Sequence, residues 1–304
     1  MNVKDKTTLP QSYNKVNLVG TLKENNLTLG IDKNGDDIIK GDMVIQTGEI
    51  EEHKVKCYAK KTTSKGNENP SYKSLAMAVD YPCIAKLTQQ GLDTSEAVRV
   101  SIRGAETRLN TYVNGKGNVV AFPEIFVSFI KHADEKEEAG ATFEVDGVLG
   151  SILPEFEKDE ETGRFVINLI LFDYKGCALP IEFIGTKEVG AYMSTHYEVN
   201  RTSRVWGKLV STVYLTTKVT EGILGDKTES FENYRREMLI TDGTPTQKEV
   251  VDGYDIELVK KAMAERQILL DELKKNGNKP SKAGFASPST ATSGTANTVQ
   301  APKW

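Results

Sequence analysis

Two short stretches, VNLVGTL at residues 16–22 and FEVDGVL at residues 143–149, predict the architecture of the chain. Both have apolar residues at their first and third positions, a glycine at the fifth and a leucine at the seventh. Alternating apolar residues are typical of a β-strand with one buried face. A glycine inside a strand often marks a bulge or a sharp bend, as at the corner of a barrel. The repeated pattern therefore indicates a duplicated β-structure.

Each stretch opens a block of about five short strand-like runs separated by turn residues. The first block includes HKVKCYAKK, VRVSIRG and PEIFVSF, and the second includes RFVINLILF, CALPIEFI and REMLITD. In both blocks a segment with helical character comes before the fourth run. We therefore predict a mainly β fold with two tandem five-stranded barrels, the first at residues 14–130 and the second at residues 141–242.

The segments outside the two blocks differ from them in composition. Residues 131–140, KHADEKEEAG, are charged and end in glycine, so we predict a linker between the barrels. In residues 254–276 apolar side chains recur at helical spacing and Asp255 can cap the start, which predicts a C-terminal helix. Residues 277–304 are mostly Gly, Ser, Thr, Ala and Pro. Such a segment cannot bury enough apolar surface to fold, so we predict a disordered tail.

The composition limits the protein's environment and its partners. The 304 residues carry a formal net charge of −4, so no overall positive field marks a nucleic-acid binder and only local charge can do so. The three cysteines are far apart and form no C-x-x-C pair, which favours a reducing compartment. No secretory signal opens the chain, and no apolar run approaches the ~18 residues of a membrane span. We expect a cytoplasmic protein with no membrane partner.

No sequence motif points to a metal, a cofactor or catalysis. DKNGDD at residues 32–37 resembles the start of a calcium-binding EF-hand loop. Asp37 and Met43 stand where such a loop needs glycine and glutamate, so a hairpin turn is favoured. GKG at residues 115–117 lacks the spacing of a phosphate loop, and the histidines form no zinc motif. We expect no cofactor and no enzymatic activity. An active site of widely spaced carboxylates is the weakest alternative.

Three strand-like runs carry cations and one aromatic ring opposite their apolar face. Strand side chains alternate between two faces, so Val55 and Cys57 point inward and their neighbours outward. We expect Ser101 to point outward as well, and the same surface to continue if the strand resumes after a bulge near Gly104. The candidate nucleic-acid-binding residues are Lys54, Lys56, Tyr58, Lys60, Arg99, Arg103, Arg108, Tyr112, Arg204, Trp206 and Lys208.

Cations next to exposed rings are suited to single-stranded nucleic acid. Cations neutralise phosphates, and the release of counterions drives binding. Flat rings stack on unpaired bases, which contributes roughly 1–3 kcal/mol per base. Two alternatives stay open, because lysines at outward strand positions also protect sheet edges from aggregation. Moreover, Tyr58 and Trp206 can be covered by a loop or by the C-terminal helix.

The two predicted barrels, the start NKVNLVGTL, the helix before the fourth strand and the basic-aromatic faces resemble the OB-fold single-stranded DNA-binding proteins, especially those of bacteriophages. The resemblance implies a non-enzymatic protein that coats and protects single-stranded DNA during replication or recombination. Bacterial members of that family recruit partner proteins through an acidic tail that ends near an aromatic residue. The tail of this chain is basic, but it ends in Trp304, which is therefore the candidate residue for binding replication or recombination proteins.

The function predicted from these features is binding of single-stranded DNA, with RNA as a possible ligand of the same kind. We expect the first barrel to supply most of the binding, because the third strand of the second barrel, ALPIEFI, is apolar or acidic. The alternative is a structural or interaction protein of a virion or replication complex, in which the barrels bind other proteins.

Overall fold

A computed structural model describes residues 9–220, 227–244 and 253–276 of the chain. The predicted tail and its Trp304 lie outside these residues. The described strands are β1 (Asn14–Asn25), β2 (Thr28–Ile31), β3 (Asp37–Gln46), β4 (Glu52–Lys60), β5 (Arg99–Val113), β6 (Val119–Val127), β7 (Lys131–His132), β8 (Gly140–Glu157), β9 (Glu160–Phe172), β10 (Ala178–Gly185), β11 (Thr202–Thr220) and β12 (Lys227–Gly243). The helices are α1 (Pro70–Ala78), α2 (Ile84–Gln90), α3 (Lys187–His196) and α4 (Ile256–Asn276), with a short 3-10 turn at Thr94–Glu96.

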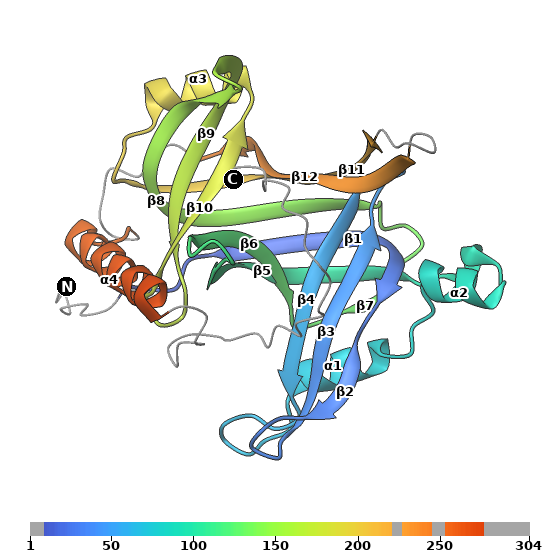
Figure 1. Cartoon of the computed structure of the whole chain (residues 1–304). Coiled ribbons are helices and arrows are strands. Elements are labelled where there is room, and N and C mark those ends of the chain that lie inside the picture. Colours follow the sequence, from blue (N-terminus) through green and yellow to red (C-terminus); the bar gives the residue numbers. More distant parts are fainter. Residues whose placement is uncertain (1–8, 221–226, 245–252, 277–304) are drawn as a thin grey trace.

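The strand pairings close into two rings (Figure 1). In ring 1 the order is β1, β3, β4, β6, β5 and back to β1. In ring 2 it is β8, β9, β10, β12, β11 and back to β8. Each ring contains one parallel pair, β4–β6 in ring 1 and β10–β12 in ring 2. In chain order, α1 and α2 come before β5 of ring 1, and α3 comes before β11 of ring 2. This is the topology of an OB-fold, and the predicted mainly β fold with a C-terminal helix is confirmed.

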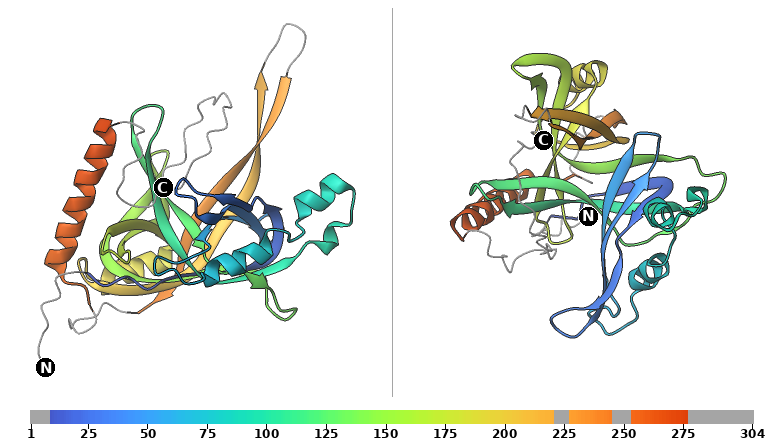
Figure 2. Two further views of the ribbon diagram at one scale, coloured as in Figure 1. Left: turned by 90° about the horizontal axis from the view of Figure 1, so that it is seen from below. Right: turned by 45° about the vertical axis from the view of Figure 1, so that its right-hand side comes forward.

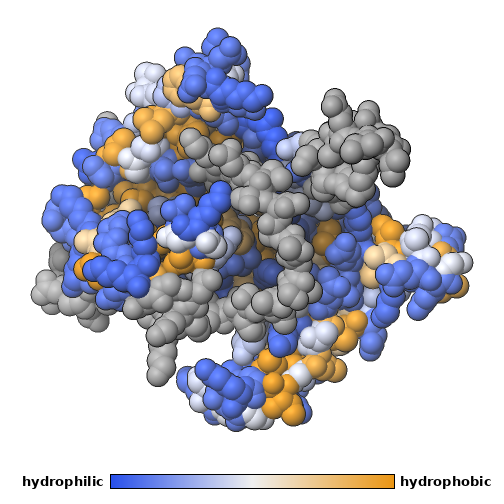
Figure 3. Space-filling model, in the orientation of Figure 1, coloured by the Kyte–Doolittle hydropathy of each residue, from blue (hydrophilic) through white to orange (hydrophobic). Residues whose placement is uncertain are grey.

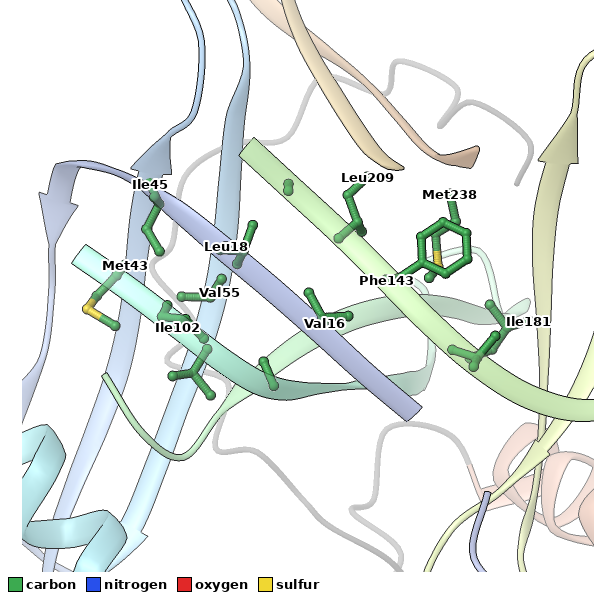
Figure 4. Packing of buried hydrophobic residues seen from close by; sticks show 14 of the residues in the cluster. Val16, Leu18, Met43, Ile45, Val55, Ile102, Phe143, Ile181, Leu209 and Met238 are labelled. Atoms are coloured by element: carbon green, nitrogen blue, oxygen red, sulfur yellow. The ribbon is translucent and has the colours of Figure 1, made fainter. Parts of the chain in front are cut away.

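Strands β1 and β8 pair antiparallel and join the two rings in one sheet. In this register Val16 lies opposite Phe143, and these are the first residues of the two repeated stretches. The pairing is therefore self-complementary, like the contact across a two-fold axis. Figure 4 shows Val16 and Phe143 in the middle of the buried cluster, with Leu18 on one side and Ile181 on the other. The apolar core runs without interruption from ring 1 to ring 2.

The two glycines of the repeated stretches allow another strand to cross closely. A Cβ atom at Gly20 would lie 2.2 Å from the carbonyl oxygen of Gln46, and one at Gly147 would lie 2.7 Å from that of Ile170. In both rings the register with the neighbouring strand then shifts within a few residues of the glycine. The sequence-based interpretation of these glycines as positions of a bulge or bend agrees with this geometry.

The helices cover different parts of the rings. Helix α1 packs Leu75 and Ala78 into the main core, and its first turn is capped by Asn69. Helix α4 lies along the side of the molecule (Figure 2) and packs Val259 and Ala262 onto the outer face of β8, β9 and β10. A separate apolar cluster forms there. The expected cap is present, because the Asp255 carboxylate accepts the amide hydrogens of Glu257 and Leu258.

The segment predicted as a linker is held against ring 1. Its first residues form β7, which pairs with β5. The Arg99 guanidinium donates a hydrogen bond of 2.7 Å to the carbonyl oxygen of Glu137. The Glu137 carboxylate in turn forms ion pairs with Arg103, at 3.6 Å, and Lys131, at 3.4 Å. This connection is therefore fixed at several points along its length.

Most of the surface seen in Figure 3 is hydrophilic, but apolar side chains gather over β2 and α1. Leu29 and Ile31 on β2 and Met77 on α1 are exposed there. Among the described strands β2 pairs with β3 alone, so its other edge is open. Within the described residues, no helix has the length and apolar character needed to cross a membrane.

The close crossing at Gly20 leads to a stability prediction. Gly20→Ala should lower the free energy of unfolding by about 1–3 kcal/mol, because the new methyl group forces backbone atoms of β3 away. Gly30→Ala is the matched control, since its Cβ atom would meet nothing within 4 Å. Urea denaturation of both variants measures the difference. Equal stability of the two would contradict the role assigned to Gly20.

Candidate nucleic-acid interface

One continuous surface on the outside of ring 1 combines cations and rings. Val55 and Cys57 are buried, so the alternate residues of β4 point outward. In the register of the sheet Asp42, Lys56 and Phe126 lie side by side on β3, β4 and β6. We call this surface the ring 1 face, and its main members are Asp42, Lys54, Lys56, Tyr58, Arg108, Tyr112, Phe122 and Phe126.

Two lysines on the ring 1 face share one carboxylate. Lys54 and Lys56 place their Nζ atoms 3.3 and 3.4 Å from Oδ2 of Asp42. Burial alone raises the pKa of Asp42, but a hydrogen bond from Asn26 and the charges of the two lysines outweigh it and lower this pKa overall. Because two ammonium groups face one carboxylate, a net positive charge remains at this point. It is available to an anionic ligand.

Lys60 lies in a different electrostatic environment at the far end of β4. Its Nζ atom is 2.7 Å from carboxylate oxygens of both Asp32 and Asp36, in the turn between β2 and β3. The hydrogen bond from Lys60 lowers the pKa of Asp32 to about 2. Two acids therefore surround this single cation, and the cluster carries no positive excess. The DKNGDD stretch forms the hairpin turn that the sequence favours, with Oδ1 of Asp32 accepting the amide hydrogens of Asn34 and Asp36.

A bulge divides the candidate residues of β5 into two groups. Gly104 has a positive φ of 71°, and the register with β1 shifts at this point. Before the bulge, Arg99 and Arg103 bind the 131–140 segment through Glu137. Ser101 lies on the face of Arg99 and Arg103, opposite the core residues Val100 and Ile102, as expected, but it is only 1% exposed because the 131–140 segment lies over it. After the bulge, Arg108 and Tyr112 continue along β6.

Arg108 and Tyr112 pack beside two rings that the sequence analysis did not single out. The Arg108 guanidinium lies 3.7 Å from the centre of the Phe126 ring and 3.1 Å from the Glu106 carboxylate. Tyr112 is 44% exposed and meets Phe122 edge to face at 6.0 Å. Phe122 and Phe126 are four residues apart in VVAFPEIFV, so the two-residue period of a strand could have predicted that they share one face. Their position beside Arg108 depends on strand pairing, which the sequence does not contain.

The candidate residues of ring 2 lie among acidic neighbours. Arg204 forms ion pairs with Glu144, at 3.5 Å, and Asp146, at 3.3 Å. Its guanidinium also lies over the ring of Tyr13, 4.7 Å from the centre. Trp206 is half-buried, and its strand neighbours are Glu144 on one side and Asp242 on the other, while Lys208 is exposed. This cluster has little free positive charge.

The structure brings Lys54, Lys56, Arg108 and Tyr112 together on the ring 1 face, with Tyr58 beside Lys40 at its far edge. It separates them from Arg99 and Arg103, from Lys60 and from the ring 2 cluster of Arg204, Trp206 and Lys208. Within the described part of the chain, no group of three or more His, Cys, Asp or Glu side chains is arranged to hold a metal ion.

Comparisons with known proteins give a family match and distantly similar solved structures. A family described as YorF matches residues 12–276. No curated protein matches the sequence. The wild-type single-stranded DNA binding protein from Thermus aquaticus aligns with a TM-score of 0.47 and 12% identity, covering 80% of this chain and 97% of that chain. A deletion mutant of the same protein gives a TM-score of 0.47 and 12% identity over 80% and 98% of the two chains. Since the family match spans most of the sequence, the chain belongs to the YorF family.

Proposed function

We propose that the protein binds single-stranded DNA on the ring 1 face and carries out no chemical step on it. The observation that supports this most is the row of Lys54 and Lys56, Phe126 and Arg108 across neighbouring strands, with Phe122 and Tyr112 continuing it. The row combines charge and ring surface across neighbouring strands. A double helix buries its base faces, so the exposed Tyr112 and the partly exposed Phe122 and Phe126 favour an unpaired strand.

The two kinds of side chain have separate tasks in this proposal. Lys54 and Lys56 meet phosphates, which compete with Asp42 for the same two ammonium groups. The rings stack on bases, at roughly 1–3 kcal/mol per base. Arg108 is already placed over Phe126, so a cation and a stacking surface stand together before the ligand arrives. Base stacking tolerates any sequence, and we therefore expect little sequence preference.

Ring 2 has a smaller part in this proposal. In ring 2 the strands that correspond to β3 and β4 are β9 and β10, and α4 packs on the outside of this pair. Arg266 on α4 donates a hydrogen bond to the carbonyl oxygen of Ala178, at 3.4 Å. A strand of DNA cannot occupy a surface that a helix already covers. This supports a binding site that is mainly on ring 1.

The wider role follows from the same proposal. We propose that the protein coats and protects exposed strands during DNA replication or recombination, without a cofactor, as a bacteriophage-encoded protein in the host cytoplasm. RNA is a second ligand to compare in the same assays. A contact of Trp304 with a replication or recombination protein is part of the proposal, although this residue lies outside the described residues.

The lysine pair gives a first test of the proposal. Replacing both Lys54 and Lys56 by alanine should weaken binding to a dT oligomer and make the log–log salt slope shallower by about 1.4, at about 0.7 for each lost phosphate contact. Lys60→Ala is the matched control, because two acids already neutralise this lysine. Fluorescence anisotropy at several salt concentrations gives both quantities. If the control loses as much as the double variant, the ring 1 face is not the site.

Tyr112 gives a second test, of stacking. Tyr112→Ala should cost about 1–3 kcal/mol of binding free energy, while Tyr112→Phe should cost much less because the ring is kept. The fold should survive both changes, since 44% of the side chain is exposed. Melting temperatures and affinities for dT oligomers, duplex DNA and RNA should be measured on the same samples. A stable Tyr112→Ala variant with wild-type affinity would show that this ring does not stack on bases.

A further inference from the structure

A pocket lies where the two rings meet, at the edge of the ring 1 face. β4 and β6 pair only through Val55–Cys57 and residues 125–127, so the hairpin of β5 and β6 diverges from the start of β4. β11 and β12 of ring 2 close the gap. The pocket is lined from ring 1 by His53, Lys54, Lys56, Thr107, Phe122, Pro123, Glu124 and Ile125, and from ring 2 by Leu209, Val210, Ser211, Arg236, Glu237 and Met238.

The ring 2 wall of the pocket is held in position by backbone contacts. The amide of Val213 donates a hydrogen bond of 3.0 Å to the carbonyl oxygen of Ile50, in the turn before β4. Next to it, Glu51 and Thr212 form an isolated β-bridge. These contacts hold the start of β4 next to the middle of β11, and both walls of the pocket are therefore part of the folded structure.

The lining combines an apolar floor with three cations. Phe122, Leu209 and Met238 supply apolar surface, and Lys54, Lys56 and Arg236 supply positive charge. Among the described residues Arg236 has no carboxylate partner, and its guanidinium lies 4.8 Å from the centre of the Tyr234 ring.

The acids and the histidine of the lining offset this charge only in part. The Glu237 carboxylate is bound by Arg164, at 2.7 Å, and by Arg235, at 2.7 Å. Burial, followed by the charge of Arg236, lowers the pKa of His53 to about 4, so this ring is neutral at pH 7. Glu124 is the remaining acid of the lining. The pocket therefore favours an anionic group at its mouth.

Two buried hydroxyl groups of the lining also lack partners. Thr107 is 1% exposed and Ser211 is 3% exposed. Neither Oγ1 of Thr107 nor Oγ of Ser211 has a hydrogen-bond partner among the described residues. A buried hydroxyl without a partner costs free energy, and a ligand with polar edges removes that cost. These hydroxyls come from opposite walls, one from each ring.

We infer that this pocket accepts one nucleotide of the bound single strand. This inference rests on the proposed function, because Lys54 and Lys56 belong both to the ring 1 face and to the pocket. A base enters against Phe122 and Met238, its polar edge meets the hydroxyls of Thr107 and Ser211, and its phosphates stay outside near Arg236 and the two lysines. An apolar ligand leaves the hydroxyls and the cations unused, whereas a nucleotide uses both. Ring 2 thus contributes to binding through β11 and β12, although α4 covers its outer face.

The test uses the full-length protein and a dT oligomer in which 5-iodouracil replaces thymine. Irradiation joins this base to neighbouring side chains, and mass spectrometry of the digested complex identifies them. We expect crosslinks in β11 or β12, including Met238, in addition to those on ring 1. Crosslinks that fall only on Tyr112, Phe126 and other ring 1 residues outside the pocket would overturn the inference.

A pair of arginine variants gives an independent readout. Arg236→Gln should weaken binding several-fold and make the salt slope shallower by about 0.7, since one phosphate contact is lost. Arg235→Gln is the matched control, because this preceding residue of β12 does not line the pocket and binds Glu237. Equal affinities of the two variants would overturn the inference. Failure of the proposed function is distinct, because the wild-type protein would then show no salt-dependent binding to dT at all.

Discussion

The antiparallel pairing of β1 with β8 is the interaction on which the rest of the structure depends. It places Val16 against Phe143, merges the cores of the two rings and pairs strand edges that would otherwise be open. β11 of ring 2 also reaches the turn before β4 of ring 1, and the pocket lies between the two rings. Val16 and Phe143, the first residues of the repeated stretches, thus lie where the two cores join.

Duplication alone would make two equivalent rings, but the segments before β1 and after β12 pack on ring 2 and make the rings different. Leu9, near the N-terminus, and Val259 and Ala262 of α4 bury the outer face of β8, β9 and β10. Polar contacts fix this arrangement, since the Tyr254 hydroxyl donates to Asp146, at 2.7 Å, and lies 2.8 Å from the hydroxyl of Ser12. Asp146 also binds Arg204, so a residue expected to meet nucleic acid takes part in the contacts that hold the segments before β1 and before α4 together. α4 also lies close to β5 and β6 of ring 1, but its apolar cluster is formed with ring 2.

The sequence predicted the strands and the duplication because both depend on local periodicity. It also predicted which side of β4 is buried, since Val55 and Cys57 alternate with lysines. It could not show which acids those lysines meet, because Asp42 approaches through the pairing of β3 with β4. For a similar reason it could not show that Ser101 is buried, as the 131–140 segment lies over this face of β5. Residues far apart in the chain become neighbours through the register of paired strands, and the sequence of a single strand does not determine that register.

The acids within the ring 1 face have a physical consequence for the proposed binding. The protein is acidic overall, and Asp42 holds Lys54 and Lys56 in fixed positions while neutralising part of their charge. A phosphate that binds there replaces an existing ion pair, so the gain in free energy is smaller than for two free lysines. Stacking on the exposed Tyr112 ring is not reduced in this way, because no ion pair has to be replaced there. Affinity should therefore depend more on the aromatic residues than the number of lysines suggests. The proposed coating role benefits from this, because moderate electrostatic binding allows the protein to be displaced when the strand is copied.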